Sequence, residues 1–431
     1  MQPLVHEEEN NTFVLYEDDN TSQNDTHLSD GARYSNSTMS IFLLWLASNI
    51  MGWIFDFLQL PTLLGGLVTG IVCKNLHAID QHLYIEETWS QFFRKAALTV
   101  ILIRAGIGLD PVALHKTKAA VFRLGIIATL LEAASIVLIA HFVIGLSFSM
   151  CILFGIILAA TSPAVTIPTM LDLIKNGYGA SSGVPSALLA SCAIDNMTCI
   201  LGFNIVVTLI FPRVNLRYEF TMMFTTIILS AIGGLIGGRI LWVFPYEGSK
   251  FVHSIRWVLS LSICLALNFG TLALEIPSAG VIATVLLNMV ASIKWKKHYK
   301  GKPYKEADTF AHMWNFFAMQ IMFSLIGYEF DFKKLYTSKI LKAFLILGTG
   351  AIVRAVSVFL LSYGCKLRTS EQLFMALAFF SKATLQAALS PQVMDRSKNN
   401  SQQHDEAHLL LSTCVIGIII MAPIGKLCSI K

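Results

Sequence analysis

The sequence predicts an all-α polytopic membrane protein with about 13 transmembrane helices, built as an inverted repeat in which two broken helices cross. Three observations carry this prediction. Apolar runs recur from Ser40 to the C-terminus, two parts of the chain match each other, and prolines interrupt one of the matched runs. A run of about 20 apolar residues is long enough to cross a bilayer as a helix.

The composition suits a chain that is solvated by lipid. Hydrophobic residues make up 55% of the chain and charged residues only 14%, whereas soluble domains carry about 25% charged residues. The net charge of +5 is not a nucleic-acid signal, because most basic residues lie in short loops between the apolar runs. Nearly all of the eight cysteines lie in or beside those runs, so we interpret them as packing residues.

The chain divides into a tail and one membrane domain. Residues 1–38 are polar and acidic, which predicts a disordered extracellular tail. Residues 39–431 predict a single transmembrane domain. Its spans are expected at about residues 40–58, 61–76, 92–109, 119–143, 148–170, 184–211, 220–244, 254–272, 276–293, 308–327, 338–363, 371–391 and 406–427.

Two signals orient the spans. The loop after the ninth span is rich in lysine, which predicts that it is cytoplasmic. Its lysines are Lys294, Lys296, Lys297, Lys300, Lys302 and Lys305. Glycosylation sequons, which are used only outside, lie in the tail and after the twelfth span. Odd numbers of spans separate both sequon regions from the lysines. The N-terminus is therefore expected outside and the C-terminus in the cytoplasm, with the plasma membrane as the expected location.

An inverted repeat connects the two parts of the chain at an offset of roughly 220 residues. The matched segments are 61–68 with 277–282, 106–110 with 326–331, and 161–165 with 381–385. Seven spans separate matched elements, so the halves insert in opposite directions. Such repeats are typical of secondary transporters that work by alternating access. Chance similarity among apolar, glycine-rich helices is the alternative.

The matched fifth and twelfth spans are both expected to be broken. Pro163 and Pro168 each remove a backbone donor from span five, and Lys382 places a charge within span twelve. Half-helix ends that face each other at the midplane would put partial charges beside an ion. A simple proline kink is the alternative.

Charged residues inside spans cost about 2.5–3.5 kcal/mol each to insert, so they are usually functional. Four lie well inside: Glu132, Asp195, Arg354 and Lys382. Glu132 and Arg354 occupy near-equivalent places in the two repeats, which predicts a structural ion pair. Asp195 and Lys382 lie on spans that should meet at the crossing, which predicts a compact proton or cation site, with a static salt bridge as the alternative.

Other polar residues extend these predictions. Ser191, Thr198 and Cys199 lie at helical spacing from Asp195 and are candidate ligands, unless they satisfy the helix backbone. Arg104 and Glu329, near the edges of spans three and ten, are candidates for gating.

Two further expectations concern packing and chemistry. Gly233–Gly238 suits close helix packing, within or between protomers. We find no phosphate loop, metal-ligand cluster or nucleophile–base set, which argues against an enzyme and predicts no cofactor.

These residues resemble the cation:proton antiporters, and within them the animal branch called sodium/hydrogen exchanger subfamily 9B, or NHA. The resemblance covers the chain from about residue 60 onwards. It rests on segments 103–110, 161–168, 195–196, 202–204 and 382–388, together with Arg354.

The resemblance implies a bacterial-type sodium/proton antiporter fold, and a lipid-embedded homodimer with a dimerisation domain and a moving core domain. It implies sodium or lithium ions and protons as substrates. The implied ion site contains Asp195, Asn196, Thr161, Ser162 and Lys382, with sodium on Asp195 and Glu132 paired with Arg354. One mammalian branch is associated with sperm, so the sperm flagellum is a location that only the resemblance implies.

The order Asp195-Asn196 departs from the family pattern. In that pattern the second position is the aspartate that binds the ion, and here it is an amide, which can ligate sodium but cannot release a proton. Three functions stay open. Asp195 alone could serve sodium/proton exchange; the chain could be a transport-defective or regulatory paralogue; or its ion coupling could be altered, as in a uniporter or an anion-coupled transporter.

Overall fold

The computed structural model describes residues 30–109, 118–162, 164–166, 170, 184–211, 216–246, 248–274, 276–299, 304–334, 337–363, 368–398 and 400–430. Throughout these segments the regular structure is helical. Each predicted span corresponds to a helix or a helical run. Nine of the described helices are long and apolar enough to cross a membrane by themselves.

The first part of the chain forms α1 (Asp30–Phe57), α2 (Thr62–Asn75), the short α3 (His77–Asp80), α4 (Glu87–Gly108), a continuous run of α6 (Lys118–Phe122), a π-helical turn (Arg123–Ile127), α7 (Ala128–Leu138) and a second π-helical turn (Ile139–Val143), then α8 (Phe148–Ala159), α10 (Val184–Ile210) and α11 (Leu216–Val243). The second part forms α12 (Val252–Ala273), α13 (Pro277–Tyr299), α14 (Lys305–Met313) joined by a π-helical turn (Trp314–Ala318) to α15 (Met319–Tyr328), a 3₁₀ turn (Phe332–Lys334), α16 (Thr337–Ser362), α17 (Thr369–Ala378), α18 (Thr384–Ser397) and α19 (Ser401–Ile430).

The prediction of a disordered tail over residues 1–38 is wrong at its end, because α1 begins at Asp30. Buried hydroxyls hold this part of α1 in place. Ser37 and Ser40 accept hydrogen bonds from the backbone N–H groups of Glu86 and Tyr84. Polar composition alone did not reveal these partners. Residues 1–29 lie outside the described part of the chain.

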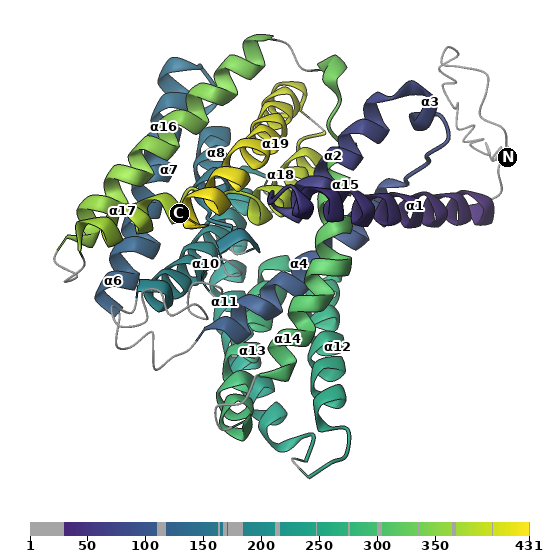
Figure 1. Ribbon diagram of the computed structural model, residues 1–431, viewed down its shortest axis with the longest axis vertical. Coiled ribbons are helices and arrows are strands. Elements are labelled where there is room, and N and C mark those ends of the chain that lie inside the picture. The colour runs from purple at the N-terminus through teal and green to yellow at the C-terminus, as the bar shows by residue number, and fades with distance from the viewer. Residues whose placement is uncertain are drawn as a thin grey trace, which may run out of the picture.

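The helices form two groups. The core group contains α6–α7, α8, α10, α16, α17, α18 and α19, and lies at the upper left of Figure 1. The panel group contains α1, α2, α4 and α11–α15, and extends to the right and below. The inverted repeat is visible in the panel, because equivalent contacts recur in it: α2 packs on α15, and their matched partners α13 and α4 pack on each other. Glycines permit both crossings; a Cβ at Gly327 would lie 2.2 Å from the Leu67 carbonyl oxygen, and one at Gly106 would lie 2.5 Å from that of Val285.

The Gly233–Gly238 pattern serves packing within the chain. A Cβ on Gly238 would lie 2.6 Å from Val290 Cβ and 2.7 Å from the Leu287 carbonyl oxygen, both on α13. A Cβ on Gly233 would meet nothing within 4 Å. The two glycines are therefore a matched pair on one helix, one in contact with α13 and one facing open space.

We expect Gly238→Ala to lower the free energy of unfolding of the purified protein by about 1–3 kcal/mol, because the added methyl group overpacks the α11–α13 contact. Gly233→Ala should leave stability unchanged or slightly higher, because alanine favours helix more than glycine does. Thermal unfolding in detergent measures both variants. Equal losses in the two would contradict this packing, and a loss of dimers in Gly233→Ala alone would assign the pattern to an interface between protomers.

Candidate functional site

Two broken helices cross at the centre of the core group. α8 ends at Ala159 and the chain is non-helical over 160–162, while α17 and α18 are separated by residues 379–383. The Ser162 N–H donates to the Ser381 carbonyl oxygen at 2.7 Å, and the hydroxyls of Ser162 and Thr384 lie 3.3 Å apart. The predicted breaks in spans five and twelve are thus confirmed. Pro163 and Pro168 themselves lie outside the described residues.

Segments that match in the two repeats meet at this crossing. Ser162 and Thr384 are 222 residues apart and touch. Glu132 and Arg354 have the same separation, and Arg354 Nη1 lies 3.6 Å from Glu132 Oε2. The charged residues therefore lie where segments from both repeats meet.

The end of α8 is capped by side chains from α18 and the break that precedes it. Lys382 Nζ donates to the Ala159 carbonyl oxygen at 2.8 Å. Gln386 Nε2 donates to the carbonyl oxygens of Ile157 and Ala160 at 2.9 and 2.8 Å. These carbonyls have no partner within the broken helix, and a cation is favoured at a helix C-terminus. The sequence analysis missed this role of Gln386, because it depends on the approach of α8 to α18 at the crossing.

The four buried charges form one cluster, but their closest partners are not the predicted ones. Lys382 Nζ lies 2.9 Å from Glu132 Oε1, and Arg354 Nη2 lies 3.1 Å from Asp195 Oδ2. The Glu132–Arg354 contact, at 3.6 Å, is the longest of the three. The predicted direct approach of Lys382 to Asp195 does not occur in the described structure, because the lysine is drawn to the end of α8 and to Glu132. The longer, forked arginine reaches both carboxylates.

Asp195 is fully buried, and hydrogen-bond donors surround its carboxylate. Oδ1 accepts from the Thr129 hydroxyl at 2.8 Å and from the Cys199 thiol at 3.7 Å. Oδ2 accepts from the Thr161 N–H and from Arg354, each at 3.1 Å. Thr129 and Thr161 also accept hydrogen bonds from Arg354, through their hydroxyls. Each oxygen of the buried carboxylate therefore accepts two hydrogen bonds.

The sequence analysis missed Thr129, which lies three residues before Glu132 on the same helix face. Of the three polar neighbours that it proposed for Asp195, only Cys199 contacts the carboxylate. The Thr198 hydroxyl donates to the backbone of Ile194, and the Ser191 hydroxyl is buried without a partner among the described residues.

Asn196 differs from its neighbour in both exposure and bonding. Its Nδ2 donates to the Cys192 carbonyl oxygen at 2.7 Å, whereas its Oδ1 is buried and accepts no hydrogen bond from the described chain. Asn196 is 5% exposed and Asp195 is 0% exposed. A cavity of about 10 Å³ also borders Glu132, Arg354 and Lys382, which is barely room for one water.

The chemistry of the crossing suits a hard monovalent cation. It offers oxygen ligands of the kinds that hard cations bind in proteins, namely a carboxylate, an amide oxygen, hydroxyls and main-chain carbonyls. The described residues hold no group of three or more His, Cys, Asp or Glu side chains that would bind a metal as a resident cofactor.

The two candidate gating residues lie apart. Glu329 pairs with Arg94, near the start of α4, whereas Arg104 is ten residues further along that helix, about 15 Å. Arg94 Nη2 also lies 3.9 Å from Asp395 on α18. Arg94, which the sequence analysis did not single out, therefore joins the panel and core groups. Arg104 Nη1 is buried and has no partner among the described residues.

Comparisons with known proteins agree with this geometry. A family model described as "Sodium/hydrogen exchanger, transmembrane" matches residues 45–426. The human sodium/hydrogen exchanger 9B1 is 31% identical over 395 residues, which cover 90% of this chain and 76% of that protein. The Xenopus tropicalis sodium/hydrogen exchanger 9B2 is 32% identical, with 90% and 72% covered. The structure of the sodium proton antiporter MjNhaP1 from Methanocaldococcus jannaschii superposes with a TM-score of 0.71 at 18% identity, covering 93% of this chain and 99% of that one.

Proposed function

The chain belongs to the sodium/hydrogen exchanger family, in its 9B branch, and from that premise we propose that it exchanges sodium or lithium ions for protons by alternating access. It is a multi-pass integral membrane protein. The observation that carries the proposal is the buried Asp195 carboxylate at the crossing, beside the Asn196 amide oxygen that accepts no hydrogen bond in the described structure. In this proposal Asp195 supplies the charge and Asn196, Thr161 and Ser162 supply neutral oxygen ligands.

Coupling follows from an exchange of partners inside the cluster. A cation that binds Asp195 must displace Arg354. Glu132 is the nearest alternative partner for Arg354, because their side chains already lie 3.6 Å apart. Once Glu132 holds the arginine, Lys382 loses its carboxylate, and an unpaired ammonium in a dry site favours the neutral amine.

This sequence of contacts predicts a fixed stoichiometry. Arginine stays protonated in proteins, so of the two bases only the lysine can release the proton. Two acids and two bases make the resting cluster neutral when all four are ionised. One cation in and one proton out keep it neutral, so we propose one-for-one exchange.

The same geometry supports a second candidate, a transport-defective or regulatory member of the family. Both oxygens of the Asp195 carboxylate already accept two hydrogen bonds each from the protein. A carboxylate held this firmly is also what a static brace requires. The two candidates differ in whether Arg354 ever leaves Asp195.

The test is proton flux driven by a sodium or lithium gradient in proteoliposomes. We expect the native chain to exchange and Asp195→Asn to reduce flux to that of protein-free liposomes. Thr198→Val is the matched control on the same helix, because its hydroxyl contacts only backbone. A silent native chain together with an active Asn196→Asp variant would reject exchange by the native protein and favour the regulatory candidate.

We also propose a homodimer in the plasma membrane, with the N-terminus outside and the C-terminus in the cytoplasm. The lysine-rich segment supports the orientation. The exposed apolar face of α11, with Ile228, Leu229, Ile232, Ile236 and Ile240, offers a surface for lipid or a second protomer. Cysteine labelling from either side of intact cells tests the orientation, and cross-linking tests the dimer.

A further inference from the structure

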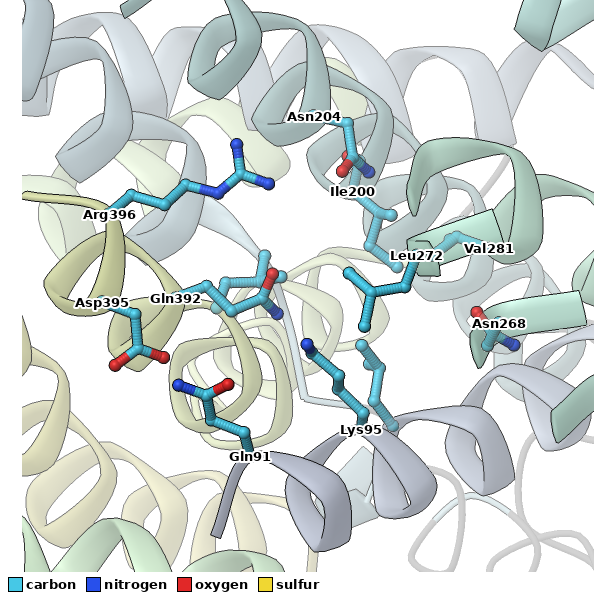
Figure 2. Close-up of a pocket in the computed structure, with 12 residues that line it drawn as sticks. Gln91, Lys95, Ile200, Asn204, Asn268, Leu272, Val281, Gln392, Asp395 and Arg396 are labelled. Carbon is cyan, nitrogen blue, oxygen red and sulfur yellow. The ribbon is translucent and has the colours of Figure 1, made fainter. Parts of the chain in front are cut away.

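A cavity of about 200 Å³ separates the core group from the panel group at one end of the molecule. Its walls come from α10 and α18 of the core and from α4, α12 and α13 of the panel. Figure 2 shows the side chains that line it. With the orientation proposed above, this end faces outward, because α4 and α13 both begin here.

The cavity lies directly outward of the charge cluster. Ile200 and Asn204 line it, and they follow Asn196 by four and eight residues on α10, which is about 6–12 Å along the helix axis. Gln392 and Arg396 line it from α18, the helix that begins beside Lys382. A molecule in the cavity would therefore lie next to the crossing.

The polar side of the cavity is positively charged. Lys95 and Arg396 line it, against one acid, Asp395. Arg94, just outside, lies 3.9 Å from that acid. The Lys95 ammonium points into the cavity in Figure 2 and donates no hydrogen bond within the described chain. A cation would be repelled here, whereas an anion would give the lysine a partner.

The other side of the cavity is aliphatic. Leu98, Ile200, Leu272, Val281 and Leu389 form this wall. Four carboxamides also line the cavity, from Gln91, Gln392, Asn204 and Asn268. At about 200 Å³ the cavity is smaller than sites for drug-sized molecules, which occupy roughly 300–1,000 Å³. The lining thus suits a small molecule with one anionic head and a short aliphatic tail.

We propose that this cavity binds a small aliphatic carboxylate, with its head on Lys95 and Arg396 and its tail on the leucine and isoleucine wall. A bound carboxylate touches core and panel helices at once. It therefore resists any movement of one group past the other, and external carboxylate inhibits exchange. This site is separate from the cation site, and binding can be measured even if the chain transports nothing.

The probe is hexanoate, compared with hexylammonium and hexanol, which share its tail. The first readout is the thermal unfolding temperature of the full-length protein in detergent. We expect hexanoate to raise this temperature and the other two compounds not to raise it. Lys95→Gln should raise the hexanoate concentration that gives the half-maximal effect by about tenfold, because a charge-assisted contact is lost. Lys398→Gln is the control, since Lys398 lies two residues after Arg396 but does not line the cavity and pairs with Glu87 instead.

Charge reversal sharpens the test. Lys95→Glu should abolish the hexanoate effect and create one for hexylammonium. Equal stabilisation by hexanol would overturn the proposal, because the anionic head would then contribute nothing. The same shift from chloride at equal ionic strength, or an unchanged hexanoate response in Lys95→Gln, would also overturn it. If exchange is measurable, external hexanoate should inhibit the native chain and the Lys398→Gln variant, but not Lys95→Glu.

Discussion

Replacing Arg354 with glutamine is expected to destabilise the protein by about 3–5 kcal/mol, because it leaves two buried carboxylates without their arginine. Arg354 is fully buried and contacts Asp195, Glu132, Thr129 and Thr161. Its guanidinium also lies 4.5 Å from the centre of the Phe379 ring, a cation–π contact. Thermal unfolding in detergent and the yield of monodisperse protein measure the loss.

A second substitution shows which carboxylate depends on Arg354. Since Asp195 is the closer partner, Arg354→Gln combined with Asp195→Asn should recover more stability than Arg354→Gln combined with Glu132→Gln. Lys382 still neutralises Glu132 in the single variant, at 2.9 Å. Better recovery with Glu132→Gln would instead support the pairing that the sequence suggested, and would contradict the geometry described above.

Replacing Lys382 with arginine is expected to abolish proton flux while the protein stays folded. Arginine keeps the positive charge beside Glu132 and the end of α8, but it does not release a proton. In the partner exchange proposed above, cation binding then has no proton to expel. The measurement is sodium-driven proton flux in proteoliposomes together with thermal unfolding.

Lys382→Gln complements that experiment. It removes the charge as well as the proton, so we expect both flux and stability to fall, because Glu132 loses its closest partner. Lys398→Gln serves as the control with a lysine that is 49% exposed and remote from the crossing. If Lys382→Arg exchanged at the native rate, the lysine would be a structural brace and the proton would have to come from Asp195.

These variants also separate the two functional candidates. An exchanger loses flux in Asp195→Asn and Lys382→Arg, whereas a regulatory member has no flux to lose and shows only the changes in stability. The position of Asn196 makes this comparison informative. Its side-chain oxygen is buried and accepts no hydrogen bond from the described chain, so Asn196→Asp would place a carboxylate oxygen where no donor of the protein already holds it.

Much of the architecture could be read from local sequence. Apolar runs of membrane length predict helices wherever they occur, because the bilayer leaves the backbone no other way to satisfy its hydrogen bonds. The inverted repeat and the breaks in spans five and twelve were likewise visible, as segments that match in order and as residues that interrupt a helix. The four buried charges could also be predicted, because each of them lies well inside an apolar run that crosses the membrane.

The tertiary structure alone decided how those charges pair and what surrounds them. Arg354 bonds to Asp195 and Lys382 to Glu132 because the end of α8 lies beside the lysine, a position set by how two distant segments cross. A shift of a few tenths of an ångström decides whether a hydrogen bond forms, whereas sequence spacing predicts only the helix face on which a side chain lies. For the same reason Thr129, Gln386 and Arg94 emerged only when helices from different parts of the chain were packed together.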